Sequence, residues 1–178
     1  CEGGVGMREG ITFRKFELGD MEMLHGWLNQ SHMREFYQKK PISLEEVTQK
    51  YSCRALNQTP THTHIVQHQG KSIGKIQCYK LSDYPDFSNQ IGVSDGASVD
   101  LFIGDPSYLG RGLGRIFLKQ YVEDIVFPLF HDISKCYIVH EIGNIGALKA
   151  SKAAGFEFLQ DVYEDGVLSE LLCYRKGN

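Results

Sequence analysis

The sequence predicts a mixed α/β fold and not a regular doubly wound sheet. Two observations lead to this prediction: some segments repeat apolar residues at helical spacing and others at strand spacing, and the two kinds do not alternate regularly. A strand is followed by two helices, three strands, a helix, a strand, a helix and two strands. The 178 residues, 42% of them hydrophobic, suffice for one sizeable core. We expect a single domain over 11–178, after a tail over 1–10 that is either a tag remnant or a trimmed start.

The N-terminal part is predicted to hold one strand and two helices. The segment 11–15 alternates apolar and polar side chains, as a strand does. Asp20 is placed to cap a helix whose apolar face is Met21, Leu24, Trp27 and Leu28. Ser43 and Glu46 form a capping-box pattern, which predicts a second helix over Val47, Tyr51 and Leu56.

The rest of the chain is predicted to be mostly strands, with two helices. Strands are expected at 64–68, 71–80, 97–103, 135–140, 157–163 and 168–174. One helix is expected over 115–127, and Asn144 is placed to cap a second one that ends before Gly155. The polar stretch 82–96 is predicted to be a loop.

Charge and hydropathy exclude several classes of protein. The formal net charge of -3 argues against a nucleic-acid partner, because such domains carry a basic surplus, and favours a cationic partner. No apolar run is long enough to span a membrane, and 1–10 lacks the apolar segment of a secretory signal. We therefore expect a cytoplasmic protein, either a monomer or a homodimer, that has no contact with a membrane.

Cysteine and histidine spacing predicts neither a disulfide framework nor a metal site. The five cysteines are odd in number and form no CxxC pair, so we expect reduced thiols. His62, His64 and His68 recur at even spacing along a strand, but no carboxylate or cysteine joins them at a useful interval. We expect no bound metal.

A glycine-rich turn is the most informative segment. The strand that ends at Ile103 leads into Gly110, Gly112 and Gly114 and then into a helix. Glycines spaced in this way let backbone N–H groups converge at a helix N-terminus, which suits a diphosphate, and Arg111, Arg115 and Lys119 add positive charge. A dinucleotide fingerprint GxGxxG does not fit because residue 115 is Arg, and GxxxxGK[ST] is absent. A tight structural turn is the alternative reading.

The strand, this turn and Gly155-Phe156 together resemble the GNAT acetyltransferase superfamily. Its loop [RQ]xxGxG is matched here except that Leu109 stands where Arg or Gln is usual. The segments 27–36, 99–106 and 109–114 are similar to those of aminoglycoside 6'-N-acetyltransferases, and the similarity runs from about Ile11 to Tyr174. The resemblance implies a mostly antiparallel central sheet with helices on both faces.

The resemblance implies that acetyl-coenzyme A is the acetyl donor, and it implies which residues bind it. The residues implied for the pyrophosphate are Leu109, Gly110, Arg111, Gly112, Leu113, Gly114 and Arg115. The strand Leu101, Phe102 and Ile103 would splay from its neighbour and pair with the pantetheine arm, with a backbone N–H polarising the acetyl carbonyl. Asn144 matches an asparagine that contacts the coenzyme.

The resemblance also implies the catalytic groups. Asp100 would bind the ammonium of the substrate and take its proton, although a carboxylate beside an ammonium also stabilises the charged form. An Asp bonded only by backbone donors is the alternative. Ser151 replaces the tyrosine that usually protonates the leaving thiolate; it is a shorter donor, or else a plain helix residue, and Tyr108 or another tyrosine could act in its place.

The candidate residues for binding a cationic substrate are acidic side chains. Asp83, Asp86 and Asp95 in the polar stretch could line a cationic pocket, or the stretch could be a solvated loop. The acid that aminoglycoside enzymes carry before the second motif falls here at Val139, so Glu141 could supply that charge from a shifted position.

We therefore predict an acetyl-CoA-dependent N-acetyltransferase for a primary amine of a small cationic substrate, foremost an aminoglycoside 6'-amine. Two alternatives stay open. One is an acyltransferase for another amine, such as a siderophore hydroxylysine-type precursor or a protein N-terminus. The other is a GNAT module that binds coenzyme A without catalysing transfer, for which Ser151 is the suggestive feature.

Overall fold

A computed structural model describes residues 10–177, which divide into two compact units. The first covers the chain up to Gln77 together with Leu101–Arg111, and the second covers Cys78–Asp100 and the chain from Gly112 onward. Residues 1–9 of the tail expected over 1–10 lie outside the described residues, and the single domain over 11–178 stays a prediction. Among residues 10–177, helices are too short or too polar to cross a bilayer.

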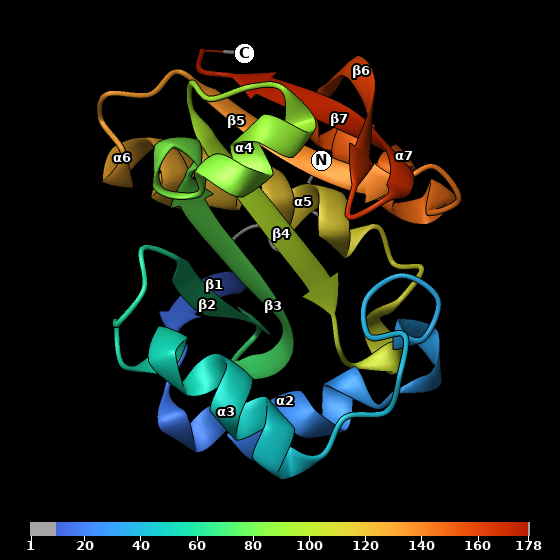
Figure 1. Ribbon diagram of the computed structural model, residues 1–178. Coiled ribbons are helices and arrows are strands. Elements are labelled where there is room, and N and C mark those ends of the chain that lie inside the picture. Colours follow the sequence, from blue (N-terminus) through green and yellow to red (C-terminus); the bar gives the residue numbers. More distant parts are fainter. Residues whose placement is uncertain (1–9, 178) are drawn as a thin grey trace, which may run out of the picture. The chain divides into compact units, whose positions relative to one another are not determined.

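Seven strands form one sheet in the order β1-β2-β3-β4-β5-β7-β6 (Figure 1). The strands are β1 (Ile11–Lys15), β2 (His62–His68), β3 (Lys71–Lys80), β4 (Ala97–Ile103), β5 (Lys135–Glu141), β6 (Glu157–Glu164) and β7 (Val167–Arg175). The β1–β2, β5–β7 and β6–β7 pairs are antiparallel, and β4–β5 is parallel. The mixed α/β class and the mostly antiparallel sheet predicted from the sequence are confirmed.

Helices and short helical turns connect the strands. The helices are α2 (Met21–Leu28), α3 (Leu44–Ala55), α4 (Pro85–Ile91), α5 (Leu113–Tyr121), α6 (Phe127–Leu129) and α7 (Ile145–Ala154). The turns are η1 (Leu18–Asp20), η2 (Ser31–Met33), η3 (Leu81–Asp83), η4 (Pro106–Tyr108) and the π-helical η5 (Val122–Val126). Each expected strand is present, with ends that differ by at most two residues.

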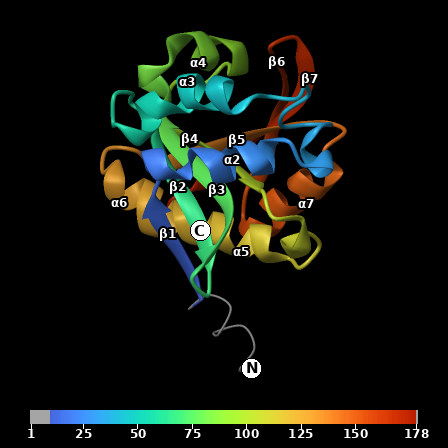
Figure 2. The same cartoon turned by 90° about the horizontal axis from the view of Figure 1, so that it is seen from below.

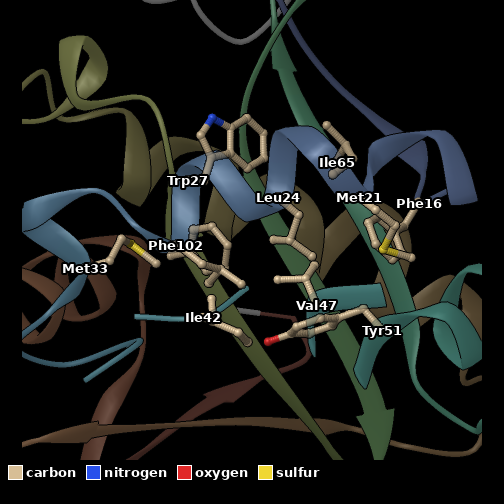
Figure 3. Packing of buried hydrophobic residues seen from close by; sticks show 11 residues of the cluster. Phe16, Met21, Leu24, Trp27, Met33, Ile42, Val47, Tyr51, Ile65 and Phe102 are labelled. Carbon is tan, nitrogen blue, oxygen red and sulfur yellow. The ribbon is translucent and has the colours of Figure 1, made fainter. Parts of the chain in front are cut away.

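The core of the first unit lies between α2, α3 and the strands (Figure 3). The apolar face expected for α2 is buried, and Trp27 packs edge to face against Phe102 with ring centroids 6.4 Å apart. Val47 and Tyr51 face the same cluster from α3, whereas Leu56 follows the helix and is exposed. Trp27 is thus a core residue, as the periodicity predicts.

Side-chain capping was predicted correctly for α3, by Ser43, and wrongly for α2 and α7, by Asp20 and Asn144. Ser43 Oγ accepts from the N–H of Glu46 at 3.1 Å, and the Glu46 carboxylate accepts from the N–H of Ser43, so the capping box is confirmed. Asp20 does not cap α2: its carboxylate accepts from both guanidinium nitrogens of Arg14, at 2.7 and 2.9 Å, and from the N–H of Glu17. The bidentate ion pair holds the pKa of Asp20 below its usual value in spite of burial.

Tight turns fix the strand registers. Gln69 and Gly70, between β2 and β3, both have positive φ, and so do Asp165 and Gly166 between β6 and β7. Two such residues form the two-residue hairpin turn whose twist matches that of the flanking strands. The first turn occupies the two residues left between the strands predicted at 64–68 and 71–80. The second sets Glu164 opposite Val167 at the end of β6.

In the second unit, residues that alternate along the strands cover both faces of the sheet. Leu171 and Cys173 of β7 pack with Tyr137 and Ile91 on the α4 face. Tyr174, of opposite parity, packs against Phe127 and Phe156. Helices α5 and α7 pack against each other in this unit, as Figure 2 shows.

The stretch 82–96 contains a helix, so the prediction of a loop was wrong. Pro85 at the first position presets helical φ, and Gly92 in the left-handed region ends α4. Helix α4 lies on β6, where Ile91 is fully buried. Only two of the seven side chains of α4 are buried, those of Ser88 and Ile91. The helix therefore has no apolar periodicity by which it could be told from a polar loop.

Four cysteines lie within the described residues, and all are free thiols. Cys78, Cys136 and Cys173 are buried in the second unit, and Tyr121 donates a hydrogen bond to Cys78 Sγ at 3.4 Å. Burial raises the pKa of Cys78 to about 11 and that of Cys136 well above its usual value. These cysteines therefore remain protonated at neutral pH.

Candidate active site

The glycine-rich turn has the backbone that an anion cradle needs. Gly110 and Gly112 both have φ of 72°, in the left-handed region, and Gly112 immediately precedes α5. A Cβ at Gly110 would meet no atom within 4 Å, so backbone conformation and not crowding calls for glycine there. The N–H groups of the first turn of α5 have no acceptor within the helix, and its dipole adds positive charge. This geometry fits a diphosphate.

Basic and apolar side chains of this segment are exposed. Arg111 and Arg115 are exposed, and Leu109 is 43% exposed. The guanidinium of Arg111 lies 4.7 Å from the ring centroid of Tyr108, which orders it before any ligand binds. Leu113 is buried and anchors α5, so only its backbone is available to a ligand.

Strand β4 carries the predicted coenzyme-binding residues and Asp100. The parallel register with β5 matches Ala97 with Cys136 and Ser98 with Tyr137. Asp100 follows two residues later and is exposed. Further along, Phe102 is buried in the core, and the carbonyl of Ile103 accepts a hydrogen bond from the ring of His32 at 2.8 Å. The expected pairing of Leu101–Ile103 with the coenzyme stays a prediction.

Carboxylates gather on the α4 face of the second unit. Tyr137 and Val139 of β5 pack in the α4 cluster, as does Val162 of β6, so Glu141 and Glu164, each two residues further on, lie on that face. Burial, together with the nearby charges of Asp100, Asp165 and Glu141, raises the pKa of Glu164 to about 7. We call Asp100, Glu141 and Glu164 the acidic face.

Aromatic rings lie beside the acidic face. Tyr79 is buried next to Tyr84, with ring centroids 4.7 Å apart, and next to Phe87 of α4 at 6.0 Å. Burial raises the pKa of Tyr79, and the nearby charges of Asp100 and Glu164 add to the shift. Rings beside carboxylates favour a cationic ligand, since both attract positive charge.

The three aspartates predicted for the substrate are not among the charges that raise the pKa of Glu164 on the acidic face. Asp83 in η3 and Asp86 in α4 are exposed. Asp95 accepts from Lys135 Nζ at 3.1 Å and from the hydroxyl of Tyr137 at 2.9 Å, so its charge is already compensated within the protein. Of the four predicted substrate carboxylates, Glu141 is the one whose charge, like that of Asp100, raises the pKa of Glu164.

Glu164 was missed by sequence reasoning. It stands 64 positions after Asp100 and belongs to no motif, and only the β6–β7 hairpin brings it to the acidic face. The Asp165-Gly166 turn was the available signal, because it fixes which side chains of β6 share a face with Val162.

Ser151 and His140 form a buried pair. Ser151 is 1% exposed, and its Oγ lies 2.8 Å from Nε2 of His140, which is 9% exposed. Burial lowers the pKa of His140 to about 4, so the ring is neutral at neutral pH. Asn144 precedes α7 but does not cap it with its side chain. The roles predicted for Ser151 and Asn144 stay predictions.

The histidines at even spacing do not form a metal site. His64 lies half-buried in β2, and burial lowers its pKa to about 4, with His62 and Lys15 adding to the shift. Over residues 10–177, no three His, Cys, Asp or Glu side chains are placed to hold a metal ion.

Comparisons with known proteins agree with the geometry. The acetyltransferase (GNAT) domain family matches residues 17–163. The aminoglycoside N(6')-acetyltransferase type 1 of Klebsiella pneumoniae is 28% identical over 154 residues, 84% of this chain and 75% of that protein.

Two solved structures share the fold. The aminoglycoside acetyltransferase AAC(6')-Ib, solved with paromomycin and acetyl-CoA, has a TM-score of 0.78 at 24% identity over 93% of both chains. An uncharacterized protein from Bacillus halodurans has a TM-score of 0.82 at 20% identity, over 93% of this chain and 83% of that one. Since the family match spans most of the sequence, this chain belongs to the GNAT acetyltransferases.

Proposed function

We propose that this acetyltransferase uses acetyl-CoA to acetylate a primary amine of a small polycation, namely the 6'-amine of an aminoglycoside. The acidic face is the observation that carries the choice of substrate. Burial raises the pKa of Glu164, and the neighbouring carboxylates add to the shift because they repel its charge; a polycation relieves that repulsion. The likeness to the Klebsiella pneumoniae aminoglycoside N(6')-acetyltransferase supports the same choice.

The glycine-rich turn fits the proposed cofactor. Gly110 and Gly112 turn the backbone so that N–H groups can meet the pyrophosphate, and exposed Arg111 and Arg115 can neutralise its charge. Bound acetyl-CoA supplies an activated acetyl thioester. The chain need only bind, orient and manage protons, so most of the rate acceleration comes from positioning and electrostatics.

Asp100 and Glu164 have different roles toward the amine: one binds the ammonium and the other accepts its proton. Asp100, exposed on β4, binds the ammonium. Glu164, with a pKa of about 7, exchanges a proton near neutral pH and accepts the one that the ammonium must lose before nitrogen can attack. The carbon–nitrogen bond then forms and the carbon–sulfur bond breaks, and the electron pair remains on sulfur. The nitrogen releases its second proton to solvent, and the thiolate takes up a proton from solvent.

A panel of amines tests the proposal. Acetyl-CoA should bind in calorimetry, and thiol release should be fast with kanamycin, which carries a 6'-amine, and far slower with paromomycin, which carries a hydroxyl there. Spermidine, a hydroxylysine derivative and a peptide with a free N-terminus represent other acceptors. Preference for one of these would reject the aminoglycoside, and binding without thiol release for any amine would show a non-catalytic coenzyme A module.

Substrate affinity should rise with pH through about 7 because of Glu164. Below its pKa this carboxyl is neutral and attracts a cation weakly, and above it the carboxylate is charged. Between pH 6 and 8 the affinity for kanamycin should therefore rise by up to about tenfold more in the native protein than in Glu164→Gln. Calorimetry of both proteins in matched buffers cancels the titration of kanamycin itself, and parallel profiles would remove Glu164 from the site.

A further inference from the structure

The buried pair His140–Ser151 is not used by the proposed function. His140 lies on β5 next to Glu141, and because side chains alternate along a strand it faces α7 and not the acidic face. Its Nε2 and Ser151 Oγ are 2.8 Å apart. Burying two polar groups costs free energy, because each loses its hydration, so their pairing calls for an explanation.

The hydroxyl of Ser151 does not take the partner that helical hydroxyls usually take. Such groups commonly donate to the carbonyl one turn earlier, as Thr48 does to Leu44 in α3 at 2.9 Å. Ser151 pairs with His140 instead, and this is the one hydrogen bond of its side chain within the described part of the chain. The imidazole therefore determines where the hydroxyl proton points.

This pairing selects one tautomer of the ring. Were the proton on Nε2, the ring would donate to Oγ and the proton of buried Ser151 would have no acceptor, which is unfavourable. With the proton on Nδ1, Ser151 donates to Nε2 and both groups are satisfied. The ring is neutral because burial lowers its pKa to about 4, so it carries a single proton, on Nδ1.

The Nδ1–H of His140 remains available to a ligand. His140 keeps 9% exposure against 1% for Ser151, and its Nδ1 is not one of the buried unpaired polar atoms in residues 10–177. Glu170, which faces His140 across the β5–β7 pair, has its carboxylate 3.6 Å from Lys152 Nζ and is thus compensated.

Helix α7 also borders the proposed cofactor cradle. Ala150, the neighbour of Ser151, has its Cβ 3.9 Å from where a Cβ would stand at Gly114 in the first turn of α5. Ser151, which holds the ring of His140 on β5, therefore lies on the helix that contacts the first turn of α5.

We propose that His140 is a catalytic residue of the acetyl transfer and that Ser151 is its positioning residue: the neutral ring donates a hydrogen bond from Nδ1–H to the coenzyme sulfur. The inference rests on the proposed function. As nitrogen bonds to the acetyl carbon and the carbon–sulfur bond breaks, negative charge grows on sulfur and strengthens this hydrogen bond. His140 keeps its proton, the amine proton goes to the acidic face, and the sulfur is protonated from solvent. A neutral imidazole acts as such a donor in other enzymes.

Two amide variants separate this role from a structural one. His140→Asn places an N–H near the position of Nδ1, and His140→Gln places one near Nε2. The proposal predicts that Asn retains much more kcat than Gln or Phe, which should each lose at least about tenfold, the loss expected for one transition-state donor. A merely structural link to Ser151 predicts the reverse order, with Gln best, and that order would overturn the proposal.

Ser151→Ala should lower kcat while leaving the calorimetric Kd for coenzyme A unchanged. Combined with His140→Phe it should be no worse than His140→Phe alone, because both changes act through one N–H. Thr48→Ala is the matched control, since it deletes an exposed helical hydroxyl that donates to a carbonyl, and it should retain full kcat. Additive losses, or an unchanged kcat in Ser151→Ala, would contradict the proposal.

Nitrogen NMR of the ligand-free protein tests the tautomer without any turnover. The two ring nitrogens of His140 have distinct chemical shifts, and the proton should be on Nδ1 in the native protein, with exchange between tautomers in Ser151→Ala. A proton on Nε2 would overturn the inference while leaving the proposed function standing. If the native protein acetylates no amine but shows the expected tautomer, it is the proposed function that fails.

Discussion

Asp100→Asn should lower kcat/KM for kanamycin by at least about 100-fold while leaving the calorimetric Kd for acetyl-CoA unchanged. The change keeps the size of the side chain but removes a negative charge from the acidic face, so the ammonium is no longer held. It also removes a charge that raises the pKa of Glu164, so that pKa should fall. Steady-state kinetics and a carboxyl titration followed by NMR measure the two effects.

Asp124→Asn is the matched control for this variant. Asp124 is exposed on η5 and belongs to neither the acidic face nor the glycine-rich turn, so kcat/KM should not change. Native turnover in Asp100→Asn, with an unchanged Glu164 titration, would show that Asp100 has no part in holding the amine.

Gly74→Ala should destabilise the protein by about 3 kcal/mol or more, the upper range for overpacking. Gly74 lies inside β3, and a Cβ there would overlap the backbone carbonyl oxygen of Phe102 and stand 3.2 Å from Cα of Ile103. Backbone atoms cannot rotate away as a flexible side chain can, so β4 would have to move. Thermal and urea unfolding measure the loss.

Gly26→Ala is the matched control and should have the opposite sign. Gly26 lies inside α2, and a Cβ there would meet no atom within 4 Å. Alanine should therefore stabilise the protein by about 0.5–1 kcal/mol, because it restricts the unfolded chain and favours the helix. Equal destabilisation by both variants would show that the approach of β4 to β3 is not what requires Gly74.

Sequence periodicity predicted the strands because each buried strand repeats its pattern over at least five residues. Helix α4 was missed because the signals that set its ends, Pro85 and Gly92, lie in a stretch whose polar composition is also typical of loops. Asp20 was wrongly predicted as a cap because nothing in the sequence shows that Arg14, across η1, competes for its carboxylate.

The candidate site was predictable where it follows a local motif. The glycine-rich turn is contiguous, so its positive φ values could be expected from Gly110 and Gly112 themselves. Glu164 and His140 depend on partners from distant elements: Glu164 on the charge of Asp100, and His140 on the hydroxyl of Ser151. Pairing of this kind requires tertiary packing, which a single sequence does not show.

Burial of the cysteines determines whether their sulfur atoms can react with a thioester bound to this protein. Acetyl groups exchange readily between sulfur atoms, but only a thiolate attacks, and burial keeps Cys78 and Cys136 protonated at neutral pH. An activated acyl group held by this protein therefore meets no competing sulfur nucleophile at either position. Resistance of these two thiols to acylation is thus a by-product of packing cysteine, a small apolar side chain, into the sheet.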